Sequence, residues 1–235
     1  MNVPSFAALL AIVSLLGCTT PPTGDPGDTS ADADGVVQAL LVDSFSARFY
    51  DRPLGGSRIV DGPCVVARSM VPAPLVAQSA GEVRVSGRAE CIASPDGSLE
   101  YFCLGTSALY VPGDLVTVAA TGATFPAFTA QVTAPSPGME VTSMVQPDTS
   151  VVIGWAGGSG RALVIAGASS ATESVFIECA VDSAVGTITV PSTVIAELRA
   201  VSATAPLTLT FVERRWVDVE GRRVLVEVGF YGGTF

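Results

Sequence analysis

Apolar and polar residues alternate one by one along much of this chain. In residues 82–86, Val83 and Val85 stand between charged or polar neighbours, so that both valines share one face of an extended segment. The same alternation recurs near the C-terminus, over residues 207–211 and 224–231. A period of two predicts β-strands with one buried and one wetted face, as in an antiparallel sheet.

Short runs of this kind recur along most of the chain, with turn-forming residues between them. We expect about thirteen strands, give or take one, near residues 44–50, 62–68, 82–88, 99–104, 107–111, 115–120, 127–133, 139–145, 150–156, 161–167, 174–182, 186–190, 206–217 and 222–231. A helical pattern is confined to residues 192–199, which is a turn or two. Short strands at such spacing are typical of a β-sandwich.

Two prolines in the segment APSPG, residues 134–138, interrupt this succession of strands. We place a domain boundary there, with one half at 38–134 and the other at 135–235, each close to the size of an immunoglobulin-type sandwich. The second half opens with the run VVIGW, whose Trp155 lies on the parity expected for the core. On these residues it resembles fibronectin type III and related immunoglobulin-like modules, which carry a core tryptophan on an early strand. The resemblance implies an all-β fold of tandem immunoglobulin-like antiparallel sandwiches, a superfold that hosts many functions.

An apolar run without charge, Phe6–Gly17, precedes the first cysteine. It is too short to span a membrane, but it fits the apolar core of a secretory signal peptide. The run ends in LLGC at residues 15–18, which resembles the lipobox of bacterial lipoproteins. The resemblance implies that residues 1–17 are a signal peptide and that Cys18 carries the acyl chains of a membrane anchor. Thr19 stands where an aspartate would retain the protein on the inner membrane, so the resemblance implies the outer membrane, on its periplasmic face or at the cell surface.

Residues 18–37 follow as a linker between the anchor and the first half. Thr19–Gly35 contains no large apolar residue and several acidic ones. Such a segment has little surface to bury, so we expect a disordered acidic tether.

The charge and the missing residue types exclude several chemistries. The net charge is −10, which repels nucleic-acid phosphates, so we expect no nucleic-acid partner. The chain has no histidine and no lysine, which excludes a Ser-His-Asp triad, a Schiff-base lysine, a histidine metal ligand and a P-loop. We therefore expect no cofactor and no metal.

Four cysteines lie beyond Cys18, and an exported chain is expected to form disulfides. Four cysteines allow three pairings, which the sequence leaves open. Cys91 and Cys103 flank the turn signal SPDG, which makes them the nearest plausible pair. Cys179 lies on the core parity of its strand, which leaves open a buried free thiol, and Cys64 is the fourth.

The densest cluster of charges is ERRWVDVEGRRV, residues 213–224. If Glu220 and Gly221 form the hairpin turn, Asp218 faces Arg223 and Arg214 faces Glu227. Opposite charges across a ladder help to hold its register, which is the interpretation we favour. The alternative is an exposed contact patch, because tryptophan and arginine are frequent in binding hot spots; its residues would be Arg214, Arg215 and Trp216.

These features predict a lipid-anchored protein of the cell envelope that is not an enzyme and that acts as a binding or scaffolding module. Its partners would be the membrane, through the anchor, and an envelope protein. One alternative is an envelope hydrolase with a carboxylate pair, although the spacing of the acids singles out no pair; the candidates are Asp43, Asp51, Asp61, Glu173 and Asp182. The other alternative is an outer-membrane β-barrel, suggested by the terminal Phe235 and the aromatics near it.

Overall fold

A computed structural model describes residues 29–51, 57–70 and 76–235. This part of the chain forms sixteen β-strands, two short 3-10 helices and one α-helix, α1 (Ser192–Val201). The predicted all-β class is confirmed. Cys18 and the predicted signal peptide lie outside the described residues.

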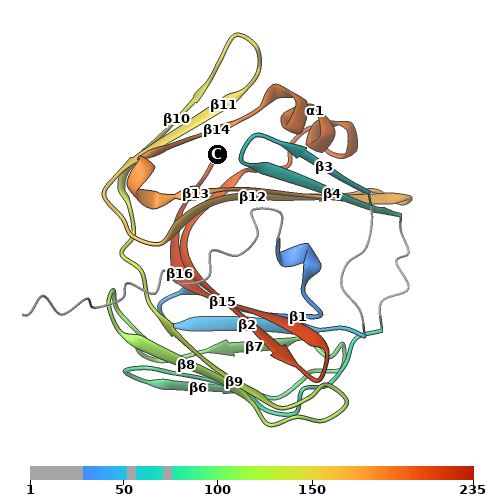
Figure 1. The fold of residues 1–235 in the computed structure, drawn as a ribbon, viewed down its shortest axis with the longest axis vertical. Coiled ribbons are helices and arrows are strands. Elements are labelled where there is room, and N and C mark those ends of the chain that lie inside the picture. The colour runs from blue at the N-terminus through green and yellow to red at the C-terminus, as the bar shows by residue number, and fades with distance from the viewer. Residues whose placement is uncertain (1–28, 52–56, 71–75) are drawn as a thin grey trace, which may run out of the picture.

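The largest sheet has nine strands, in the order β3-β4-β13-β12-β15-β16-β1-β2-β7. Their bounds in that order are β3 (Ser57–Asp61), β4 (Cys64–Met70), β13 (Glu173–Asp182), β12 (Arg161–Ser169), β15 (Thr208–Val219), β16 (Arg222–Thr234), β1 (Gly35–Leu41), β2 (Ser44–Phe49) and β7 (Tyr101–Leu104). All neighbours are antiparallel except β1 and β16, which run parallel. Figure 1 shows that this sheet bends strongly along the long β15–β16 hairpin. The hairpin joins two parts of the sheet that we call its arms: one consists of β3, β4, β13 and β12, and the other of β1, β2 and β7.

Two smaller sheets cover the outer sides of the two arms (Figure 1). One consists of β6 (Glu90–Ala93), β5 (Val83–Ser86), β8 (Leu115–Ala120) and β9 (Phe128–Thr133). The other consists of β10 (Met139–Val145), β11 (Val151–Ala156) and β14 (Thr187–Val190), with α1 beside it. Each arm of the bent sheet therefore belongs to its own two-layer sandwich.

Each sandwich encloses a separate apolar core. Phe45 and Phe49 pack in the first core with Val226 of β16, and Trp155 packs in the second with Phe211 of β15. The β15–β16 hairpin thus supplies side chains to both cores, which ties the two sandwiches into one body.

Most of the predicted strands are present, and so is the helix, which is longer than expected. The predicted strand at 107–111 is wrong: Leu109 and Tyr110 are buried, but they lie in a loop whose backbone bonds to the β1–β2 turn. The pattern missed β1, β3 and β6 because they are short or follow polar residues.

The described end of the predicted linker is ordered, which corrects the expectation of a disordered tether for residues 29–37. Ser30–Asp32 form a 3-10 helix and β1 begins at Gly35. Ala31 and Ala33 are buried, because small side chains fit the narrow space between the two arms of the sheet.

Strands from both sides of the predicted boundary at 134 share the large sheet. β4 pairs with β13, and β16 pairs with β1. A tandem of separate immunoglobulin-like sandwiches is therefore not confirmed, and the boundary remains a prediction.

Two disulfides are present. Cys91 and Cys103 are bonded, the pair that flanks the turn, with 6.0 Å between their Cα atoms. Cys64 and Cys179 are bonded as direct cross-strand neighbours of β4 and β13. Cys179 is buried as expected, but a free thiol is wrong, because the partner comes from a strand 115 residues away.

In the described part of the chain, no helix combines the length and the apolar character needed to cross a bilayer.

Candidate functional site

A cavity of about 430 Å³ lies on the concave face of the large sheet, between its two arms. Its position follows from the alternation along each strand. In β12, Ala162 and Val164 point into the second core, whereas Leu163 and Ile165 line the cavity. The wetted face that a period of two predicts is here a cavity wall, because the sheet bends around it.

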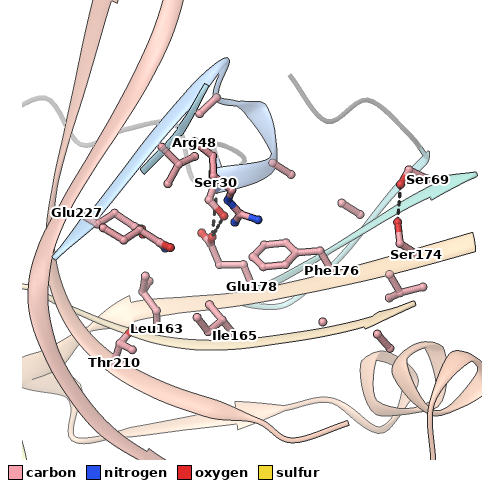
Figure 2. Close-up of a pocket in the computed structure, with 18 of the residues that line it drawn as sticks. Ser30, Arg48, Ser69, Leu163, Ile165, Ser174, Phe176, Glu178, Thr210 and Glu227 are labelled. Carbon is pink, nitrogen blue, oxygen red and sulfur yellow. Dashed lines mark hydrogen bonds between the residues drawn. The ribbon is translucent and has the colours of Figure 1, made fainter. Parts of the chain in front are cut away.

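Much of the cavity wall is apolar. Leu163, Ile165 and Phe176 come from one arm, and Val36 and Leu40 of β1 come from the other. Figure 2 shows Leu163 and Ile165 on one side of the cavity and Arg48 of β2 on the opposite side.

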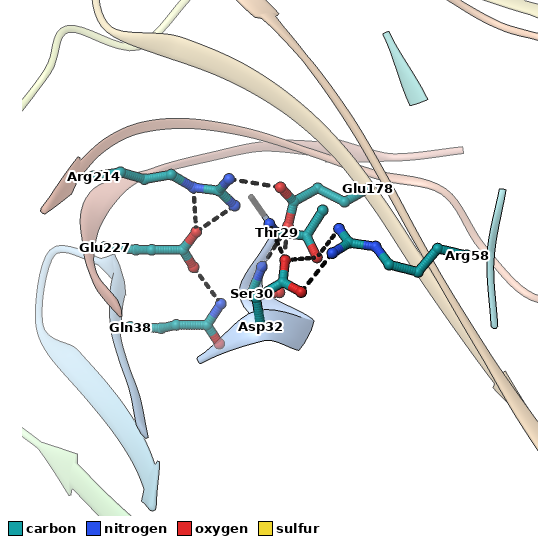
Figure 3. A network of polar contacts seen from close by, with 8 residues as sticks. All are labelled: Thr29, Ser30, Asp32, Gln38, Arg58, Glu178, Arg214 and Glu227. Atoms are coloured by element: carbon teal, nitrogen blue, oxygen red, sulfur yellow. Dashed lines mark hydrogen bonds and ion pairs between the residues drawn. The ribbon is translucent and has the colours of Figure 1, made fainter. Parts of the chain in front are cut away.

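Three buried charged residues meet beside this apolar wall (Figure 3). Arg214 of β15 donates from Nε to Glu227 of β16 at 2.7 Å and from Nη1 to Glu178 of β13 at 2.6 Å. The side chain of Arg214 is 7% exposed and each glutamate side chain 2%. The three groups carry a net charge of −1 and have little exposed surface.

The outer oxygens of both carboxylates also have partners. Gln38 of β1 donates to Glu227 Oε2 at 2.6 Å. The backbone amide and the hydroxyl of Ser30 lie 3.3 Å from Glu178 Oε2. All four carboxylate oxygens are therefore engaged by the protein.

Arg214 stays charged at any ordinary pH. Burial by itself would lower its pKa, but the charges of Glu227 and Glu178 and their hydrogen bonds outweigh burial and raise the pKa above its usual value. The cluster therefore contains a permanent cation between two carboxylates.

The N-terminal turn closes part of the cavity over this cluster. Asp32 pairs with Arg58 of β3 at 2.5 Å, and its other oxygen accepts from the Thr29 amide at 2.7 Å. Ser30 and Ala31 line the cavity next to Glu178. These contacts hold the turn against β3 and β13, directly before β1 in the other arm.

Not every polar side chain on the cavity is engaged in this way, and Thr210 and Arg48 are two examples. The Thr210 side chain is buried, and its hydroxyl has no hydrogen-bond partner among the described residues. Arg48 has no carboxylate of the described residues within ion-pair distance. Both are candidates to bind a ligand. Within the same residues, no group of three acidic or sulfur ligands is placed to share a metal ion.

The three residues of the proposed contact patch, Arg214, Arg215 and Trp216, do not form one exposed surface in the structure. The predicted register is confirmed, with Arg214 opposite Glu227 and Asp218 opposite Arg223. Arg214 is nevertheless buried in the ionic cluster, and Arg215 is exposed on the other face of the sheet. Trp216 is half-buried, with the Arg223 guanidinium 4.2 Å from its ring.

None of the five acids considered for a carboxylate pair lines the cavity. The converging acids are Glu178 and Glu227, and Glu178 was missed. Its signal was present, because it is charged in the apolar run VFIECAV and lies on the face opposite to Cys179. The sequence does not show that β15 lies near β13 in the sheet, and this arrangement is what brings Arg214 to Glu178.

The sequence matches no protein-family model and no curated protein.

Proposed function

We propose that this protein is a lipid-anchored lipoprotein of the cell envelope, at the outer membrane, that binds a small ligand in its central cavity without transforming it. The observation that carries the proposal is the cavity of about 430 Å³ with an apolar wall and a few fixed polar groups. Ligand sites typically measure about 300–1,000 Å³ and have this composition.

The ionic cluster favours binding over hydrolysis. Glu178 and Glu227 converge on one concave surface, as a carboxylate-pair hydrolase requires. Arg214 occupies the space between them, and Ser30 and Gln38 take their remaining oxygens. General acid and base catalysis needs a carboxyl that exchanges a proton with the substrate, and neither oxygen pair is available for that.

Two features support the location. The LLGC motif resembles a lipobox, and the two disulfides are typical of an oxidising compartment outside the cytoplasm. Since Cys18 lies eleven residue steps before Thr29, the first described residue, the acyl chains would be held within about 40 Å of Thr29.

Ligand binding is tested by filling the cavity. Gly167 lines it, and a Cβ added there would meet one atom, a carbonyl oxygen at 4.0 Å. We expect the full-length chain with Cys18→Ser, free of attached lipid, to bind the neutral dye Nile red saturably, and Gly167→Phe to abolish that binding. Gly97→Phe is the matched control, because Gly97 lies in an exposed turn with open space around it. Equal binding by the Gly167→Phe variant would refute the proposed site.

The anchor is tested by Cys18→Ser in cells of a Gram-negative host. We expect the variant to leave the membrane fraction and to lose the mass of the acyl chains, whereas Cys91→Ser/Cys103→Ser should stay in the membrane. Unchanged partitioning and mass of the Cys18→Ser protein would overturn the proposed location.

A further inference from the structure

The central cavity continues toward one edge of the large sheet. A second hollow of about 150 Å³ lies over β1, β2 and β7, and it shares Gln38 and Leu40 with the cavity. Ser44, Ser46 and Phe102 also line it, whereas the side chain of Phe45 packs in the first core on the other face of β2. We call this second hollow the edge groove.

The edge groove ends in large exposed apolar side chains. Phe102 is 69% exposed, Leu104 66% and Leu41 54%. In the sheet, Phe102 pairs with Ser46 and Leu104 with Ser44, so small serines separate the β7 side chains from those of β1. The result is a trough over β2, with serines at its base and exposed apolar side chains beside it.

A cation stands at the inner end of this trough. Arg48 lies on the same face of β2 as Ser46 and Ser44, and it lines the central cavity. Arg48 lies four residue steps along the strand from Ser44, which is about 13 Å. The other two cationic side chains of the described wall are already paired, Arg214 with Glu178 and Glu227 and Arg68 with Glu173 and Glu197. Arg48 is therefore the cation in that wall that remains for a ligand.

We infer that the edge groove and the adjoining cavity bind a single long-chain carboxylic acid. The carboxylate pairs with Arg48, and the alkyl chain lies over Ser46 and Ser44, between Leu40 and the β7 side chains Phe102 and Leu104. Charge complementarity at Arg48, the continuity of groove and cavity, and the exposed apolar side chains Phe102 and Leu104 all favour this occupant over a soluble polar ligand. The inference rests on the proposed function, because it assumes that the cavity is a ligand site.

The test compares three ligands that have the same ten-carbon alkyl chain and different polar head groups: decanoate, decanol and decyltrimethylammonium. The protein is the full-length Cys18→Ser chain, because attached acyl chains would compete for the groove. By isothermal titration we expect decanoate to bind about tenfold more tightly than decanol, from one charge-assisted hydrogen-bonded pair. Decyltrimethylammonium should bind most weakly.

Two sets of variants separate the contribution of the ligand's head group to binding from that of its alkyl chain. Arg48→Met should weaken decanoate about tenfold and leave decanol unchanged, whereas Phe102→Ser/Leu104→Ser should weaken both. Arg215→Met and Val60→Ser are the matched controls, since Arg215 is exposed on the opposite face and Val60 is 67% exposed on the far edge strand. An unchanged unfolding midpoint in urea confirms that each variant is folded.

Each other outcome overturns the inference. Equal affinity for decanoate and decanol, or no effect of Arg48→Met, refutes the role of Arg48. Tighter binding of decyltrimethylammonium points to a cationic ligand. If Phe102→Ser/Leu104→Ser has no effect on binding, the edge groove is not part of the ligand site. If Nile red binding depends on Gly167 but decanoate does not bind, the proposed function stands and this inference fails.

Discussion

At the scale of single residues, burial follows the parity along each strand, and the exceptions gather at the cavity. Val83 and Val85 are fully buried, as the alternation predicts. Glu178 and Glu227 are nearly as buried, although they lie on the faces that the pattern marks as wetted. A charge at such a position requires an opposite charge and hydrogen bonds, because an isolated buried ion is very costly.

Removal of Arg214 should therefore destabilise the protein severely. Arg214→Met leaves two buried carboxylates without their cation, and we expect a loss of about 3–5 kcal/mol in the free energy of unfolding. Urea unfolding followed by circular dichroism measures it. Arg215→Met is the control and should change stability by less than about 0.5 kcal/mol, because Arg215 is exposed. The combination Arg214→Met/Glu178→Gln/Glu227→Gln should recover much of the loss, and a single Arg214 variant as stable as the control would contradict the argument.

At the scale of elements, the β15–β16 hairpin and the disulfides connect parts that the sequence keeps apart. The hairpin turn lies at Glu220 and Gly221, where both residues have positive φ, as a two-residue turn requires. The turn fixes the register and the cross-strand charges agree with it, which is why its pairing was predictable. The Cys64–Cys179 disulfide joins β4 to β13, and nothing in the local pattern of either strand indicates that contact.

The two disulfides should contribute unequally to stability. In the chain-entropy model the stabilisation grows with the closed loop, and the separations are 115 and 12 residues. We expect Cys64→Ala/Cys179→Ala to lose about 5 kcal/mol and Cys91→Ala/Cys103→Ala about 3 kcal/mol. Free energies of unfolding in urea give the comparison, and a larger loss for the Cys91–Cys103 pair would contradict it.

At the scale of the whole molecule, one continuous sheet joins two cores. Leu209 and Phe211 of the hairpin belong to the second core, whereas Val224, Val226 and Val228 belong to the first. If either core unfolded, the hairpin side chains that pack in that core would lose their contacts. The two sandwiches should therefore unfold together, unlike two domains joined by a linker.

The two tryptophans report on the two ends of this body. Trp155 is buried in the second core, and Trp216 lies on the hairpin next to Val217, which packs against the first. We expect Trp216→Phe, which leaves Trp155 as reporter, to show one urea transition that coincides with that of circular dichroism. Trp155→Phe, which leaves Trp216, should behave in the same way. Separate midpoints in either variant would support two independent domains divided near residue 134.

The sequence by itself determined the features that depend on neighbours along the chain. It predicted the all-β class, the parity that buries Trp155 and Cys179, and the register that sets Arg214 opposite Glu227. Period-two alternation, turn residues and charges across a short hairpin are all local, so a single sequence contains them.

Only the tertiary structure decided which distant strands meet. The parallel pairing of β1 with β16, the Cys64–Cys179 bond and the arrival of Glu178 at Arg214 each join segments far apart in the chain. Strands with the same alternation are interchangeable by pattern, and their pairing depends on how the whole sheet bends and buries both cores. The cavity exists because of that bend, so no single stretch of the sequence predicts it.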